Sequence, residues 1–221
     1  MKLFKNNQTG RSMVEMLGVL AIIGVLSVGG IAGYSKAMSK YKFNKLTDDI
    51  TMLIANIRTT FSAQGNYKGL TSEKAIQLGI VPDSMIIERS NGMKELVSPY
   101  ADVEGLIQYS DLRTDGDAGA FIILINRVPR EDCVALATAD WGSNEGSGLV
   151  AIGVGSSSDI QTVMDIFYID NPLETQPDTE YSFAKPGSAN YPTPMKVADA
   201  TAACAEKYRG VDRNTIIWKY Y

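Results

Sequence analysis

Few side chains of this chain could carry out covalent or metal chemistry, and they stand far apart in the sequence. The 221 residues include no histidine and two cysteines, Cys133 and Cys204. Two isolated cysteines cannot complete a four-ligand zinc site, and no histidine is present to activate a serine as a nucleophile. The sequence therefore predicts no catalytic residues, no metal site and no cofactor.

Two interpretations are open for the cysteines. If the body of the protein lies outside the cytoplasm, we expect a disulfide between Cys133 and Cys204, because oxidising compartments preserve such bonds. In the alternative interpretation, both residues are buried, unpaired thiols.

Three carboxylates gather in the stretch "DLRTDGDAG", at Asp111, Asp115 and Asp117. The stretch is weakly similar to a calcium loop, but its spacing does not fit the EF-hand pattern and no glutamate occupies the twelfth position. A tight hairpin turn before a strand at Phe121 is the favoured interpretation. Whether a calcium ion binds near Asp115 stays open.

Another carboxylate, Glu15, has an unusual position. It is the one charged residue in the apolar run 13–32, which would span ~30 Å as a helix. A secretory signal peptide that begins with Lys2, Lys5 and Arg11 would have a shorter apolar region, and a plain single-pass anchor is the other simple interpretation. Neither explains Glu15, because a carboxylate near a membrane is normally retained for a partner.

The residues "GRSMVEML" resemble the prepilin signature of type IV pilins and their secretion-system relatives. The resemblance rests on a short basic leader that ends at Gly10, a glutamate five positions later and an uninterrupted apolar helix. It implies cleavage between Gly10 and Arg11 by a prepilin peptidase and N-methylation of Arg11. It also implies that Glu15 sets the register between subunits by pairing with the amino terminus of a neighbour.

Arg11 departs from the family pattern, because type IVa pilins favour phenylalanine at the first mature position and type IVb pilins favour other large apolar residues. Its guanidinium lies four residues before Glu15 on the same helical face, so it could also pair with Glu15 within one chain.

The chain divides into three parts in this interpretation. Residues 1–10 form the leader, residues 11–62 form a polymerisation helix that spans the membrane at about 13–34, and residues 63–221 form a globular head. Beyond the span, the helix is expected to become amphipathic and to end at Gln64, Gly65 and Asn66. Its apolar stripe is Tyr34, Met38, Tyr41, Leu46, Ile50, Leu53, Ile57 and Phe61, and its polar face is Lys36, Lys40, Lys42, Lys45, Asp48, Asp49 and Arg58.

The expected fold class is α+β, with the long helix packed on an antiparallel sheet and a disulfide-closed C-terminal region. "TSEKAIQLG" predicts a short helix capped by Thr71 or Ser72. The runs "AGAFIILINRV", "CVALATA", "GLVAIGV", "VMDIFYI" and "NTIIWKYY" predict strands, and the proline-rich segment 170–194 predicts a surface excursion.

"MKVADATAACAEKYRG" predicts a late helix that stops at Gly210, with Val197, Thr201, Cys204 and Tyr208 on one face. The disulfide would tie this helix to the strand that begins at Cys133. "LGIVPDSMI" and "CVALATADW" resemble the type IVb and conjugative-plasmid pilins more than the type IVa pilins.

A net charge of −4 and a pI near 5.0 offer little attraction for nucleic acid. The resemblance implies a structural subunit and not an enzyme. The subunit would be stored in the inner membrane with a cytoplasmic N-terminus, and an assembly platform would polymerise it with other copies of itself into an extracellular filament. That filament would serve adhesion, motility, DNA transfer or conjugation. A minor pilin, a type II secretion pseudopilin and a membrane-anchored extracytoplasmic binding module are the alternatives.

Overall fold

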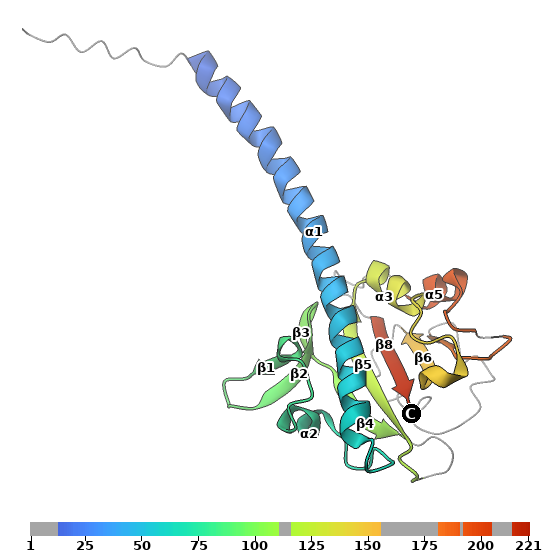
Figure 1. The fold of residues 1–221 in the computed structure, drawn as a ribbon. Coiled ribbons are helices and arrows are strands. Elements are labelled where there is room, and N and C mark those ends of the chain that lie inside the picture. The colour runs from blue at the N-terminus through green and yellow to red at the C-terminus, as the bar shows by residue number, and fades with distance from the viewer. Residues whose placement is uncertain (1–12, 111–115, 156–180, 191, 205–213) are drawn as a thin grey trace, which may run out of the picture. The chain divides into compact units, whose positions relative to one another are not determined.

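The computed structural model describes residues 13–110, 116–155, 181–190, 192–204 and 214–221 (Figure 1). The chain forms two compact units, residues 1–42 and 43–221. The helix α1, Met13–Phe61, contributes to both units.

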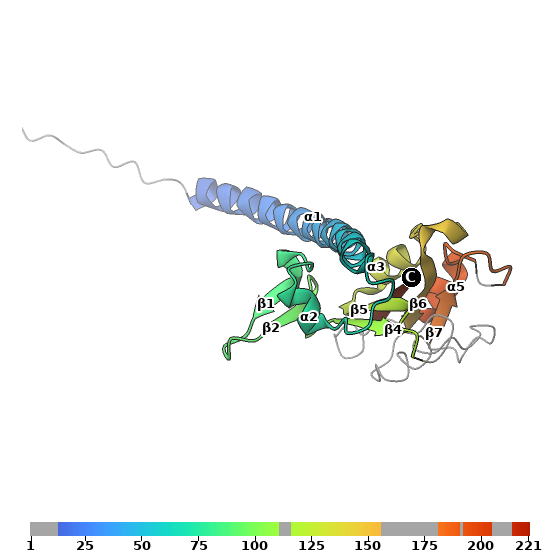
Figure 2. The same ribbon diagram turned by 60° about the horizontal axis from the view of Figure 1, so that its bottom comes forward.

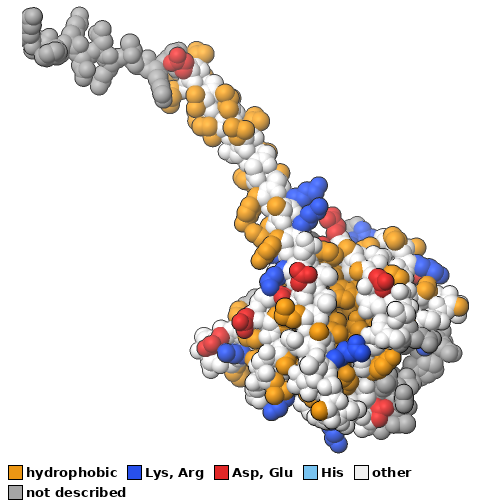
Figure 3. All heavy atoms as spheres, in the orientation of Figure 1, with side chains coloured by type: hydrophobic (Ala, Val, Ile, Leu, Met, Phe, Trp, Pro, Cys, Tyr) orange, Lys and Arg blue, Asp and Glu red, His pale blue; other side chains and the backbone are white. Residues whose placement is uncertain are grey.

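The described part of the first unit is the N-terminal portion of α1. No proline occurs before Pro82, so nothing in the sequence interrupts the helical hydrogen bonds. The large apolar side chains of this portion are exposed, as Leu17 (61%), Ile23 (53%) and Val28 (72%) illustrate. Figure 3 shows hydrophobic side chains along this portion of the helix.

The second unit is built around a five-stranded antiparallel sheet with the order β4-β5-β8-β6-β7. Its strands are β4 Leu106–Ser110, β5 Ala120–Val128, β6 Leu149–Gly155, β7 Tyr181–Ala184 and β8 Asn214–Tyr220. The last strand of the chain occupies the middle of the sheet, where all seven of its residues are buried. Its run of β-branched and aromatic residues suits such a central position.

A second sheet has three antiparallel strands in the order β1-β2-β3, which are Ile86–Glu88, Lys94–Ser98 and Ala101–Glu104. It meets the large sheet at Gly105, between β3 and β4. A Cβ at this position would lie 3.0 Å from the Leu124 carbonyl oxygen, so glycine permits the close approach.

Short helices complete the unit. They are α2 Ser72–Gln77, α3 Arg130–Ala137 and α5 Val197–Ala203, with 3₁₀ turns at Asp83–Met85 (η1) and Glu145–Ser147 (η2). The Thr71 side chain accepts a hydrogen bond from the Lys74 N–H at the start of α2, which confirms the predicted cap.

The core of the second unit lies between one face of the large sheet and residues 43–61 of α1. Figures 1 and 2 show this part of the helix over the sheet, with the three-stranded sheet and α2 on one side of it and α3 and α5 on the other. A row of directly paired residues, Ile123, Trp218 and Ile152, crosses three strands beneath it. Leu46, Ile50, Leu53 and Ile57 of α1 are completely buried against this core, as the stripe predicted.

The fold prediction is confirmed in class: a long N-terminal helix, antiparallel sheets and a disulfide that closes the C-terminal region. Three predicted strands are also present, as β5, β6 and β8. The predicted strand "VMDIFYI" lies outside the described residues.

The predicted strand "CVALATA" is wrong, because these residues belong to helix α3. A short apolar run does not distinguish a buried strand from a buried helix, and the signals before it decide. Pro129 fixes the backbone φ at −57° directly before the helix, and Glu131 and Asp132 stand in the first turn, where the helix dipole favours acidic residues. The disulfide therefore joins two helical segments and not a helix and a strand.

Two further expectations are corrected in the C-terminal region. Residues 181–184 of the predicted surface excursion form the edge strand β7, in which Phe183 is 3% exposed. In α5 the buried residues are Ala200 and Ala203, whereas on the predicted face Cys204 is buried and Val197 is 66% exposed. Tyr208 and Gly210 lie outside the described residues.

Candidate assembly interface

The apolar portion of α1 is the first candidate surface. Among the described residues, α1 is the one helix that is both long enough and apolar enough to cross a membrane. None of its most apolar window is buried. Core helices of soluble proteins and signal sequences pass the same test, but a core helix would be buried. The exposed surface of this portion must therefore find an apolar environment outside its own unit.

Glu15 lies in the first turn of α1. A carboxylate is favourable there because the N–H groups of the first turn point towards it. Gly10 and Arg11, the predicted cleavage and methylation sites, lie outside the described residues, as does Asp115.

The glycines of the apolar portion contact nothing in their own unit. A Cβ added at Gly18, Gly24, Gly29, Gly30 or Gly33 would meet no atom within 4 Å. Each glycine costs a helix roughly 1 kcal/mol relative to alanine in water. No contact within the described chain compensates for this cost.

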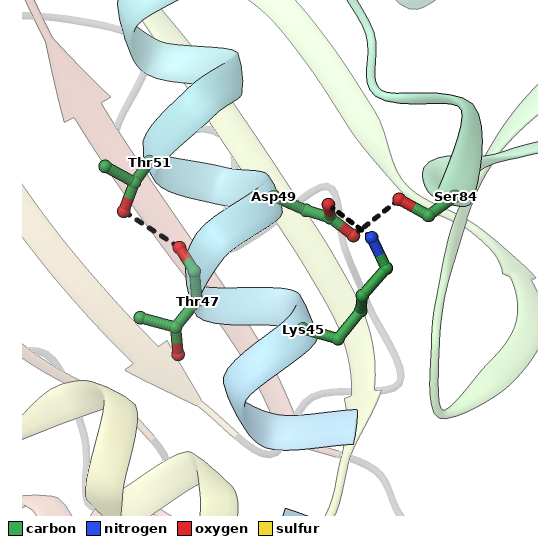
Figure 4. A network of polar contacts seen from close by, with 5 residues as sticks. All are labelled: Lys45, Thr47, Asp49, Thr51 and Ser84. Carbon is green, nitrogen blue, oxygen red and sulfur yellow. Dashed lines mark hydrogen bonds and ion pairs between the residues drawn. The ribbon is translucent and has the colours of Figure 1, made fainter. Parts of the chain in front are cut away.

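The second candidate feature is a buried polar contact between α1 and the 3₁₀ turn η1 (Figure 4). Asp49 is 3% exposed, and its carboxylate accepts hydrogen bonds from Lys45 Nζ at 3.0 Å and from Ser84 Oγ at 2.8 Å. The sequence prediction placed Asp49 on the polar face of the helix, which is wrong. The four-residue spacing of Lys45 and Asp49 in the sequence could have indicated their ion pair. The hydrogen bond from Ser84 could not be found in this way, because it depends on the tertiary fold.

Two more polar contacts hold the same stretch of α1. Asn56 Nδ2 donates a hydrogen bond to the Ile80 carbonyl at 2.8 Å, and Arg58 Nη1 donates one to the Ser147 carbonyl at 3.0 Å. The Arg58 guanidinium lies against Gly148, where a Cβ would be 2.8 Å from Nη2 and the backbone φ is +84°. The positive φ favours glycine at this position, and the absence of a side chain leaves room for the guanidinium.

The disulfide between Cys133 and Cys204 joins α3 to the C-terminal cap of α5. Both cysteines are buried, at 0% and 1% exposed. Arg130 supports the same junction, because its guanidinium donates to the carbonyls of Cys204 and Thr201 at 2.9 and 3.3 Å. The predicted pairing is confirmed, with helix α3 in place of the predicted strand.

A groove of about 630 Å³ lies between α2 and the β1–β2 hairpin, lined by Ser72, Glu73, Ile76, Gln77 and residues 92–96. Among the described residues, no group of histidine, cysteine, aspartate or glutamate could hold a metal ion. Asp117 of the predicted turn accepts a hydrogen bond from the Gly119 N–H at 2.8 Å.

Three tyrosines among the described residues of the head have a raised pKa. Burial raises the pKa of Tyr220 to about 12, and burial together with the nearby Asp132 carboxylate raises the pKa of Tyr100. Burial also raises the pKa of Tyr67, partly offset by Arg58. These phenols therefore stay neutral over the physiological range.

An apolar N-terminal helix and a disulfide-closed α+β head are the features that the resemblance to type IV pilins implied. Among solved structures, the chain shares its fold with TcpA, a type IV pilin from Vibrio cholerae El Tor biotype. The TM-score is 0.51 and the identity 18%, over 82% of this chain and 99% of that one. The type IV b pilin from Salmonella typhi matches with a TM-score of 0.47 and 14% identity, over 79% of this chain and 98% of that one.

The family model described as "PilS N terminal" matches residues 40–220. The chain therefore belongs to this family, and the resemblance to type IV pilins is confirmed. As a pilin it is a structural subunit and not an enzyme. No curated protein matches the chain.

Proposed function

We propose that this chain is a subunit of a type IVb-like pilus. It is stored in the inner membrane as a single-pass protein with a cytoplasmic N-terminus and then polymerised with copies of itself into an extracellular filament. The exposed apolar surface of α1 carries this proposal, because no described part of the chain buries its most apolar window. Lipid in the stored subunit and neighbouring helices in the filament would cover that surface in turn.

Processing precedes assembly in this proposal. A prepilin peptidase cleaves between Gly10 and Arg11, the new amino terminus of Arg11 is methylated, and an assembly platform in the inner membrane receives the mature subunit. The support is the basic leader that ends at Gly10, together with Glu15 five positions later at the head of the apolar run. The functional division is then a leader of residues 1–10, a polymerisation helix of residues 11–62 and a head of residues 63–221.

Glu15 is the register residue of this assembly. When the apolar helices leave lipid and pack together, its carboxylate enters an environment of low dielectric constant and needs a positive partner. The amino terminus of a neighbouring subunit supplies that charge at one axial stagger. The glycines between Gly18 and Gly33 would allow close approach of neighbouring helices, which explains residues that no contact in their own unit requires.

N-terminal sequencing of the mature protein, with electron microscopy and mass spectrometry of purified surface filaments, tests the proposal. We expect a chain that begins at Arg11 and is present in the filaments. A mature chain that begins after Ala32 would have lost the polymerisation helix and would contradict the proposal.

The same experiment separates the alternatives. A minor pilin would be a trace component of the filaments, and a type II secretion pseudopilin would be absent from surface pili. The groove between α2 and the β1–β2 hairpin is the observation that favours an anchored binding module. Such a module would stay in the membrane and form no filament.

A further inference from the structure

Three lysines and two tyrosines follow the apolar portion of α1 directly. We call Tyr34, Lys36, Lys40, Tyr41 and Lys42 the basic collar. Tyr34 is 65% exposed and Tyr41 is 62% exposed, while Lys36 and Lys40 are exposed and Lys42 is partly exposed. All five belong to the first compact unit, so the collar is a feature of the helix itself.

The collar carries uncompensated positive charge. No acidic residue occurs between Glu15 and Asp48. The next lysine, Lys45, forms an ion pair with Asp49 in the second unit, but Lys36, Lys40 and Lys42 form no ion pair with any described residue. Three cations within seven residues, just after an apolar span, are placed to meet an anionic partner.

The distribution of the collar around the helix indicates what kind of partner this is. Successive residues of a helix are rotated by roughly 100° about its axis, so Lys36 and Lys40 lie on one side of the helix. The two tyrosines are rotated by about 100–160° from these lysines, and Lys42 lies on a third side. A docking site for one protein surface would gather these residues on one face of the helix. A bilayer surrounds a spanning helix on every side, so a ring of cations and aromatic rings fits its headgroup layer.

The depth of the collar agrees with that layer. The 22 residues 13–34 would span about 33 Å as a helix, against a hydrocarbon thickness of about 30 Å. Tyr34 then lies at the boundary, where aromatic belts occur, and Lys36 to Lys42 lie ~3–12 Å beyond it. Flexible lysine side chains reach back to lipid phosphates over this distance.

We propose that the basic collar binds the phosphate groups of anionic phospholipids in the leaflet where the C-terminal end of the span emerges. The inference rests on the proposed function, because it concerns the subunit stored in the membrane. The ammonium groups of Lys36, Lys40 and Lys42 pair with headgroup phosphates, and the tyrosine rings lie at the interface. These contacts fix the depth of the helix before assembly.

The balance of charge across the span gives this proposal further support. Cytoplasmic flanks of membrane helices normally hold the excess of lysine and arginine. Here Lys2, Lys5 and Arg11 precede the span, whereas four lysines follow it between Lys36 and Lys45. The lysines after the span work against the proposed orientation, so their presence requires another benefit, and headgroup binding provides one.

Spin-labelled lipids in vesicles of phosphatidylcholine and phosphatidylglycerol provide a direct test with the full-length protein. Electron paramagnetic resonance reports the preference of the helix for labelled phosphatidylglycerol over labelled phosphatidylcholine. We expect K36Q/K40Q/K42Q to reduce this preference by about twofold or more. The wild-type preference should also weaken at high salt, which screens exposed charges.

Two further variants make the result specific. K36R/K40R/K42R keeps the charge and should keep the preference. K68Q/K74Q/K94Q removes three exposed lysines of the head and should leave it unchanged. The proposal that the collar binds anionic lipid would be overturned if K36Q/K40Q/K42Q kept the wild-type lipid preference. It would also be overturned if the head variant lost as much of this preference as K36Q/K40Q/K42Q.

Carbonate extraction distinguishes this failure from failure of the proposed function. If the protein is inserted but shows no lipid preference, lipid binding by the collar is refuted and the proposed function is not. A wild-type protein that carbonate removes from membranes refutes membrane storage, and the collar with it.

Discussion

Glu15 illustrates how one side chain can have different consequences in two environments. It lies in the first turn of a helix whose next twenty residues carry no charge. Near the membrane interface the first-turn N–H groups and nearby water stabilise the carboxylate. Inside a packed filament the same charge would need a cation, so its effect is expected at assembly.

Glu15→Gln should therefore leave the protein synthesised, inserted and cleaved, but should sharply reduce the yield of filaments. Membrane insertion should improve slightly, because a charge is removed from an apolar segment. Quantitative electron microscopy of sheared filaments, with immunoblots of the membrane fraction, measures both effects. A wild-type filament yield would contradict the role of Glu15 in register.

Arg11→Phe identifies the partner of Glu15. If the terminal amine of a neighbour is the partner, this variant should assemble normally or better. If the Arg11 side chain is the partner, Arg11→Phe should reduce the filament yield, as we expect for Glu15→Gln. The circular dichroism of the head should be unchanged in both variants.

At the scale of elements, residues 43–61 of α1 are held to the head by an apolar stripe and by specific polar contacts. Each fully buried leucine or isoleucine contributes roughly 1.5–3 kcal/mol relative to an exposed one. The Asp49 carboxylate adds specificity, because its hydrogen bond from Ser84 forms only when η1 is in place.

Ser84→Ala should lower the free energy of unfolding by about 1–3 kcal/mol, because one oxygen of a buried carboxylate loses its donor. Ser62→Ala is the matched control, since the Ser62 hydroxyl is exposed and donates only to the Thr59 carbonyl. The control should change stability by less than about 0.5 kcal/mol. Urea unfolding of the detergent-solubilised chain measures both, and equal effects would argue against the Asp49 contact.

The link between α3 and α5 gives a second prediction at this scale. The disulfide closes a separation of 71 residues, and its loss should cost about 2–4 kcal/mol. The double variant C133A/C204A and the reduced wild type should therefore unfold at similar, lower urea concentrations. Thiol alkylation of the untreated protein should label neither cysteine, and full labelling would contradict the bond.

At the scale of the whole molecule, the buried tyrosines make the head sensitive to high pH. Tyr220 is 3% exposed and donates a hydrogen bond to the Trp141 carbonyl at 2.8 Å. Because burial raises the pKa of Tyr220 to about 12, the folded state favours the neutral phenol. This contribution is complete below the unfolded pKa of about 10 and is lost as the pH rises from there through 12.

The contribution of Tyr220 to the free energy of unfolding should therefore be constant from pH 7 to 9 and should decrease above pH 10. Tyr220→Phe should be less stable near neutrality by about 1 kcal/mol, because one hydrogen bond is lost. It should nevertheless lose less stability between pH 9 and 11 than the wild type does. Urea unfolding at a series of pH values measures this, and parallel profiles would contradict the assignment to Tyr220.

The sequence alone determined those features that depend on local pattern. The apolar run without proline indicated a spanning helix, the three- and four-residue spacing from Leu46 to Phe61 located its buried stripe, and Thr71 marked the start of α2. The sequence also identified Cys133 and Cys204 as the only possible disulfide partners, because the chain has no other cysteine, and the structure showed that they pair. The processing site and the register role of Glu15 remain predictions from the sequence.

Only the tertiary structure decided the features that depend on residues distant in the chain. Residues 181–184 resemble surface loop in sequence, yet backbone pairing with β6 makes them a buried edge strand. Asp49 is polar and lies among polar residues in sequence, but Ser84, 35 positions away, supplies the hydrogen bond that permits its burial. Local spacing cannot reveal such partners, because they meet only after the chain has folded.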